Sequence, residues 1–261
     1  MIDAIVCAKD VDPNFGFGLE CLERQRDLGK IIVVIPEKDR RTYETACCYR
    51  TVPIREPTVS CLAWARKQGA LAASNKFICF VDADVLLGKD HLIQLRRKAE
   101  RWLEFTSHVA IEGILNILYT KNTLTNVPVK YLPEFLRLNK RGFLHNTLLK
   151  RESVLSWKPQ YAFAWEDYLL TRHIQSLGGF WIRVQQEAKS LHLSDGNKYA
   201  AAKWSGAGER VVRGWSWDKG NALARVLQKD GRYYYAKVVS LAGQVIGNLQ
   251  ASKHLEKIGA K

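Results

Sequence analysis

Two aspartates, Asp82 and Asp84, follow directly after the apolar run 77–81. The run predicts a buried strand, and the carboxyl ends of strands in open α/β sheets commonly carry ligand sites. Side chains alternate along an extended chain, so both carboxylates point the same way and repel each other unless a cation lies between them. Mg²⁺ or Mn²⁺ bridging to a diphosphate would stabilise the pair. The alternative is an ordinary acidic turn after a strand.

A second acidic pair, Glu166 and Asp167, begins the helical stretch 166–176, which Gly178 and Gly179 end. A carboxylate here can remove the proton from an attacking hydroxyl, and the helix dipole favours its ionised form. The alternative is that both carboxylates only stabilise the start of the helix.

The stretch 60–87 resembles the donor-binding half of family 2 inverting glycosyltransferases, which have the A-type fold. Ala65, Arg66 and Gly69 match the family's Ala-Arg-Asn-x-Gly helix, although Lys67 replaces the usual Asn. The apolar strand and the Asp-x-Asp sequence at 82–84 then follow in the family's order. The first block therefore implies binding of a nucleoside-diphosphate sugar.

The stretch 143–179 resembles the acceptor side of the same family. Glu166 and Asp167 stand where the family places its catalytic base. The resemblance therefore implies that Asp167 is the base, with Glu166 as the second candidate. With the outer strands included, the two blocks cover roughly three-quarters of the chain. The resemblance implies a metal-dependent, hexosyltransferase-like enzyme that transfers a sugar with inversion from a nucleotide-sugar donor. The acceptor could be a glycan, a lipid-linked molecule or a protein.

The resemblance also implies a metal and nucleotide site. Asp84 would be the direct ligand of Mg²⁺ or Mn²⁺, with Asp82 directed to metal or ribose and His192 completing the site. The residues expected around the nucleotide are Ala8, Lys9, Asp10, Glu37, Arg66, Asp82 and Ala83. Glu37 replaces the family's acidic residue after the second strand. Several alternatives stay open: a packed histidine at 192, solvated loop charges at 9, 10 and 37, and a surface arginine at 66.

These residues require an alternating scaffold. Uncharged apolar runs at 4–8, 31–35 and 77–81 predict buried strands, and the helical stretches 19–28 and 60–73 lie between them. A helix at 90–105 and strands at 108–111 and 143–149 should follow. We therefore expect an α/β, A-type nucleotide-diphospho-sugar transferase fold with a mostly parallel sheet flanked by helices. The catalytic domain would span 1–195, with a donor half at about 1–105 and an acceptor half at about 106–195.

A basic, aromatic helical extension is expected at 196–261. Its glycines and tryptophans predict an irregular connection at 204–230. The segment 237–250 is amphipathic, with Val238, Leu241, Val245 and Leu249 on one helical face. This helix would either lie on an anionic membrane surface that carries the acceptor, or dock on the catalytic domain.

The composition bounds the remaining alternatives. The net charge of +14 over 261 residues suits phosphates, anionic lipids or nucleic acid. We do not expect nucleic acid as a partner, because no recognised nucleic-acid-binding motif is visible. A nucleotidyltransferase usually has a Gly-rich, Arg-containing loop after its first strand, whereas the loop 10–18 has no basic residue. Without a secretory signal or a long apolar run, we expect a cytoplasmic protein, peripheral at the membrane if the extension binds lipid.

Overall fold

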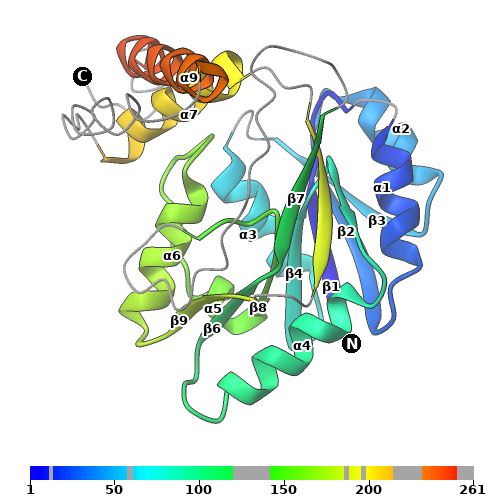
Figure 1. Cartoon of the computed structure of the whole chain (residues 1–261). Helices are drawn as coiled ribbons and strands as arrows, with labels where there is room; N and C mark the ends of the chain where they lie inside the picture. Colours follow the sequence, from blue (N-terminus) through cyan, green and yellow to red (C-terminus); the bar gives the residue numbers. More distant parts are fainter. Residues whose placement is uncertain are drawn as a thin grey trace.

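The computed structural model describes residues 1–11, 14–57, 61–119, 142–184, 188–194, 198–213 and 231–251 (Figure 1). A seven-stranded sheet with the order β3-β2-β1-β4-β8-β6-β9 forms its centre. A three-stranded sheet with the order β5-β10-β7 lies beside it. The expected α/β class with a mostly parallel sheet is confirmed.

The first four strands of the large sheet are parallel, and they are β1 (Ile2–Cys7), β2 (Leu28–Pro36), β3 (Thr51–Glu56) and β4 (Phe77–Asp82). They are connected through helices α1 (Asn14–Glu23), α2 (Arg40–Cys47) and α3 (Leu62–Ala72). The central strands are buried on both faces, which explains their continuous apolar runs. Because the strands run in parallel, their carboxyl ends meet along one edge.

The second half of the sheet is mixed. Strand β8 (Asn146–Lys150) runs antiparallel to both β4 and β6 (Val109–Glu112), and β9 (Phe180–Arg183) is parallel to β6. The smaller sheet consists of β5 (Val85–Leu87), β10 (Lys189–Ser194) and β7 (Ile114–Tyr119). Its pairing places His192 opposite Val85, directly after the Asp-x-Asp turn.

Helices cover both faces of the large sheet (Figure 1). Side chains of α1 and α4 (His91–Trp102) pack in one hydrophobic core, together with residues of the small sheet. Side chains of α3, α5 (Arg151–Leu155) and α6 (Glu166–Ser176) pack in a second core on the other face. Two separate cores on one sheet hold the strands rigidly and leave the carboxyl edge open for a site.

Two predicted elements begin or end at other residues than expected. The helix predicted at 19–28 begins earlier, at Asn14, and ends at Glu23. Asp27 has a left-handed φ of 70°, which ends helical geometry, and Leu28 already belongs to β2. The strand predicted from Phe143 begins at Asn146. The domain boundary predicted at Asp195 lies outside the described residues.

Two helices, α7 (Lys198–Arg213) and α9 (Gly231–Leu249), pack against each other in the C-terminal extension (Figure 1). The irregular connection predicted at 204–230 is therefore wrong for 204–213, while 214–230 lie outside the described residues. The glycines that suggested irregularity serve close packing instead. A Cβ at Gly206 would collide with the backbone of Gln244, and one at Gly208 would lie 2.5 Å from the Cβ of Ala164. Helix α7 therefore packs against the residues directly before α6.

The face of α9 that packs on α7 is not the predicted one. Gly243 and Gly247 are buried, whereas Val245 and Leu249 are 44% and 61% exposed. Small residues occupy the packed face of α9 because they let the two helix backbones approach closely. Among the described residues, no helix has the length and hydropathy needed to cross a bilayer. Contact with a membrane surface stays a prediction, for which Val245 and Leu249 supply exposed apolar side chains.

We predict that Gly247→Ala loosens the helix pair, because the added Cβ would collide with the backbone of Lys203. Overpacking of this kind costs about 1–3 kcal/mol, which calorimetry or thermal unfolding should report as a lower Tm. Leu249→Ala on the same helix is the matched control, because its exposed side chain should change stability by less than about 0.5 kcal/mol. Equal Tm values for the two variants would contradict the observed packing.

Candidate active site at the carboxyl edge of the parallel sheet

A cavity of about 830 Å³ lies at the carboxyl edge of the parallel strands. It brings together all but one of the residues that the sequence predicted for the site: Ala8, Lys9, Asp10, Arg66, Asp82, Ala83, Asp84, Glu166, Asp167 and His192. The exception is Glu37, which is exposed and does not line the cavity. Their roles stay predictions, but residues far apart in the chain share one space.

Arg66 is buried at the centre of this site, where it is only 2% exposed. Its Nη2 donates to Asp82 Oδ1 at 2.9 Å, and its Nε donates to Glu166 Oε1 at 3.1 Å. Burial by itself lowers the pKa of Arg66, but Glu166 and Asp82 outweigh it and raise the pKa overall. The alternative of a surface arginine is therefore wrong. The Arg66 side chain therefore joins the end of β4 to the start of α6.

Asp82 has cationic or hydrogen-bonding partners at both oxygens. Besides Arg66 at Oδ1, His145 Nδ1 lies 2.5 Å from Oδ2. Burial raises the pKa of Asp82, but His145 and Arg66 outweigh it and hold the pKa well below its usual range. Burial lowers the pKa of His145, and Asp82 reverses this so that the pKa is raised overall. Local sequence patterns did not predict the contact of His145 with Asp82, because it depends on the antiparallel pairing of β8 with β4.

Asp84 contacts His192 across the small sheet, with 2.8 Å between Oδ2 and the imidazole Nε2. The His192 ring stacks on His145 with centroids 5.7 Å apart, and Phe143 stacks on the other side of His145 at 5.4 Å. This stack fixes the imidazoles at the cavity wall. The Asp84 side chain remains 48% exposed, so its carboxylate is accessible from the cavity.

The metal prediction can be tested against these donors. A carboxylate oxygen of Asp84 and an imidazole nitrogen of His192 are both ligands that Mn²⁺ accepts. Within the described part of the chain, no three His, Cys, Asp or Glu side chains are grouped as metal ligands. Mg²⁺ and similar ions often use one or two protein ligands and take the rest from phosphate and water. The pair fits such an ion, whereas both oxygens of Asp82 already have partners.

The acidic pair stands at the first turn of α6, where both Glu166 and Asp167 are 5% exposed. Burial raises the pKa of Glu166, and Arg66 only partly opposes this. The backbone N–H of Tyr168 donates to Asp167 Oδ1 at 2.7 Å. The preceding residue, Trp165, has a left-handed φ of 67°, a strained conformation of the kind found at functional sites.

Helix α7 supplies a wall that the sequence did not predict. Trp204 and Ser205 line the cavity, and Ser205 Oγ accepts a hydrogen bond of 3.0 Å from Trp165 Nε1. The Trp204 ring is edge-on to Phe163 at 5.8 Å, and the residue remains 51% exposed. No local pattern could have revealed this wall, because it depends on where the extension docks.

The side of the cavity that is formed by the residues after β1 is less buried. Lys9 and Asp10 lie 3.7 Å apart as an exposed ion pair, and the Asp10 backbone N–H donates to Asp39 Oδ2 at 2.7 Å. Asp39 also caps α2 through Thr42, so the loop after β1 is held against this helix. Lys9 and Asp10 both line the cavity while their side chains remain exposed to solvent.

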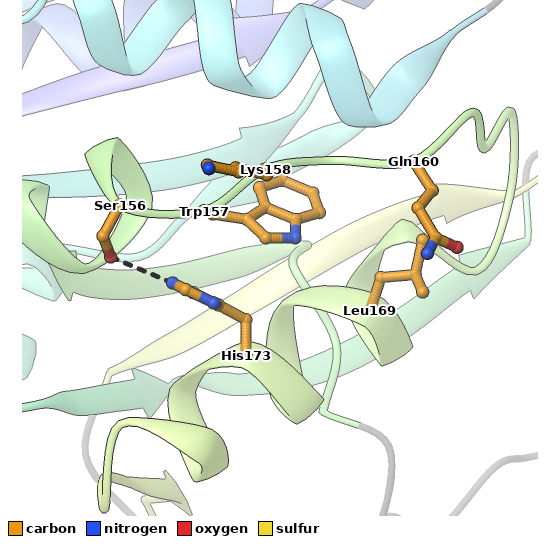
Figure 2. Close-up of a pocket in the computed structure, with 6 residues that line it drawn as sticks. All are labelled: Ser156, Trp157, Lys158, Gln160, Leu169 and His173. Carbon is orange, nitrogen blue, oxygen red and sulfur yellow. Dashed lines mark hydrogen bonds between the residues drawn. The ribbon is translucent and has the colours of Figure 1, made fainter.

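A second cavity of about 370 Å³ lies apart from this site and shares none of its lining residues. Figure 2 shows its lining of Ser156, Trp157, Lys158, Gln160, Leu169 and His173. His173 Nε2 lies 3.0 Å from Ser156 Oγ, but no carboxylate lines this cavity. His173 is therefore separated from the two acidic pairs, which line the larger cavity.

We predict that Arg66→Met destabilises the fold strongly, because it leaves Asp82 and Glu166 without their shared cation. Removing one partner of a buried ion pair costs about 3 kcal/mol, measurable by denaturant unfolding. The control is Arg24→Met, which removes a pair with Glu20 that is 72% and 44% exposed and should cost less than about 0.5 kcal/mol. Similar losses in both variants would show that Arg66 does not hold the two blocks together.

Comparison with known proteins gives a fold but no close relative. Neither family models nor curated protein sequences match the chain. The crystal structure of S. aureus TarS is similar with a TM-score of 0.54 and 12% identity, over 95% of this chain and 55% of that one. The present chain thus spans little more than half of that TarS chain.

Two further crystal structures are similar. One is S. aureus TarS 1–349 in complex with UDP-GlcNAc, with a TM-score of 0.56 and 10% identity over 98% of this chain and 91% of that one. The other is a mycobacterial protein with a TM-score of 0.55 and 13% identity, over 80% and 74% of the two chains. At these identities the likeness establishes architecture alone. The chain has the A-type glycosyltransferase fold, as its two sequence blocks predicted.

Proposed function

We propose that this protein transfers a sugar from a nucleoside-diphosphate sugar to an acceptor, with inversion and with the help of a divalent metal ion. The observation that carries the proposal is the single cavity that gathers Asp82, Asp84 and His192 on one side and Glu166 and Asp167 on the other. Support for the donor class comes from TarS 1–349, which was crystallised with UDP-GlcNAc. The acceptor would enter beside the aromatic wall of α7.

Asp167 is the base in this proposal. An inverting transfer needs one carboxylate to take the proton of the acceptor hydroxyl while that oxygen attacks the anomeric carbon and the nucleoside diphosphate leaves. Glu166 is less suited, because its Oε1 already accepts from buried Arg66, and protonation would weaken that ion pair. Glu166 then acts as a positioning residue, which fixes the first turn of α6 against α3.

Asp82 holds and orients the donor. A carboxylate has about four acceptor sites, so its contacts with Arg66 and His145 leave capacity for a ribose hydroxyl. Asp84 and His192 would hold Mg²⁺ or Mn²⁺. When bound, such an ion supplies positive charge that stabilises a leaving diphosphate.

We predict that Asp167→Asn lowers turnover by about 10²–10⁴-fold, because an amide cannot accept the proton. Donor binding, measured by calorimetry, and the thermal unfolding temperature should stay near those of the unmodified protein. Glu152→Gln is the control, since it removes an exposed carboxylate at the start of α5. Substantial remaining turnover in Asp167→Asn would assign the proton transfer to another group.

We predict that chelation of divalent ions lowers turnover at least about tenfold, and that added Mn²⁺ or Mg²⁺ restores it. Asp84→Asn should raise the Mn²⁺ concentration needed for half-maximal turnover, because it weakens one ligand. Glu100→Gln, which removes a carboxylate from the exposed face of α4, should leave this concentration unchanged. Full turnover in excess chelator would refute the metal role.

A further inference from the structure

Glu56, the last residue of β3, is a buried carboxyl group without an evident structural role. It lines the site cavity and is only 6% exposed. Its Oε1 is shielded from solvent and has no hydrogen-bond partner among the described residues. Buried polar atoms of folded proteins nearly always have partners, so an unpaired one in a cavity wall calls for a ligand that supplies the missing donor.

The surroundings of Glu56 do not compensate its charge. Burial raises the pKa of Glu56 to about 7, and among the described residues no cation opposes this shift. An apolar residue would avoid this penalty, because an unpaired buried carboxylate is costly to the fold. Retaining an acid here is consistent with a benefit that appears only when the cavity is occupied.

Glu56 lines the cavity at the end of β3, three strands away from the end of β4. In the strand order β3-β2-β1-β4, three strand spacings, or about 14 Å, separate the end of β3 from that of β4. The floor between them is formed by small or apolar residues, including Cys7, Ala8 and Val34. A diphosphate near Asp84 would direct the nucleoside along this floor, with its base toward Glu56.

We infer that Glu56 selects the donor's nucleobase by accepting a hydrogen bond from a ring N–H, which restricts the donor to uracil or guanine nucleotides. The inference rests on the proposed function, because it takes the cavity to be the donor site. An ionised carboxylate only accepts hydrogen bonds. Uracil and guanine present a ring N–H on their pairing edge. Cytosine and adenine offer the carboxylate only an exocyclic amino group, beside a ring-nitrogen lone pair that repels it, so they should bind less tightly. Glu56 thus takes the place that the sequence had given to Glu37.

The test is the binding of UDP, GDP, CDP and ADP to the full-length protein by calorimetry at about pH 8, where most Glu56 is ionised. UDP or GDP should bind at least about tenfold more tightly than CDP and ADP, because a site with a buried polar group strongly rejects a ligand that leaves it unpaired. Whichever of UDP and GDP binds more tightly identifies the base of the donor. Glu56→Gln should reduce this preference to less than about threefold, because an amide also offers a donor to cytosine or adenine.

Glu37→Gln is the matched control, an exposed glutamate at the neighbouring strand end, and it should leave base preference unchanged. Glu56→Gln should also unfold at a temperature no lower than the unmodified protein, because it removes a buried charge without a partner. A purely structural Glu56 would instead lower that temperature and leave base preference intact. Should Glu56→Gln not fold, Glu56→Asp must weaken the favoured nucleotide while keeping the order of bases.

The outcomes separate the inference from the proposed function. Tight binding of one nucleotide with the same base preference in Glu56→Gln overturns the role of Glu56 and leaves the donor site standing. A preference for CDP or ADP in the unmodified protein also overturns it. If none of the four nucleotides binds, with or without Mn²⁺, both the donor site and the inference fail.

Discussion

The site depends on the two ion pairs that the buried guanidinium of Arg66 forms. This guanidinium joins a carboxylate at the end of β4 to one at the start of α6, from residues 16 and 100 positions away in the chain. Taking three charged groups out of water is costly, and their attraction compensates only in good geometry. The cost is tolerable here because both carboxylates bond to the same cation, which also lies 5.2 Å from the Phe80 ring centroid. The result is a fixed distance between the end of β4 and the first turn of α6.

The many carboxyl groups of the cavity lining are a reason why the proposed metal ion would suit the site. Among the described residues, its lining has one Arg and one Lys against six carboxyl groups: Asp10, Glu56, Asp82, Asp84, Glu166 and Asp167. Such a surface repels a diphosphate unless cations are added. The chain's net charge of +14 attracts anions at long range, where salt screens it, but does not neutralise this wall. A divalent ion at Asp84 and His192 would supply charge at the place where the leaving group needs it.

The sequence predicted those parts of the site that follow one another along the chain. Asp82 ends a buried strand and Asp84 follows it, and Glu166 and Asp167 start a helix, so local patterns located both pairs. His145 and Glu56 were missed because their importance arises from neighbours in space. His145 reaches Asp82 through the antiparallel pairing of β8, and Glu56 became isolated only when β3 took its place in the sheet. A solvated glutamate and a buried unpaired one look alike in sequence.

The packing of the C-terminal extension also could not be predicted from local sequence patterns, and this packing reaches the candidate site. Periodicity assigned the large apolar residues of α9 to its packed face, yet glycines form the contact with α7 because only they let the backbones approach. Helix α7 in turn packs Gly208 on Ala164 and accepts a hydrogen bond from Trp165 through Ser205. Trp165 is held in a left-handed conformation immediately before the two acidic residues of α6. The extension therefore supports the backbone directly before the acidic pair, which includes the proposed base.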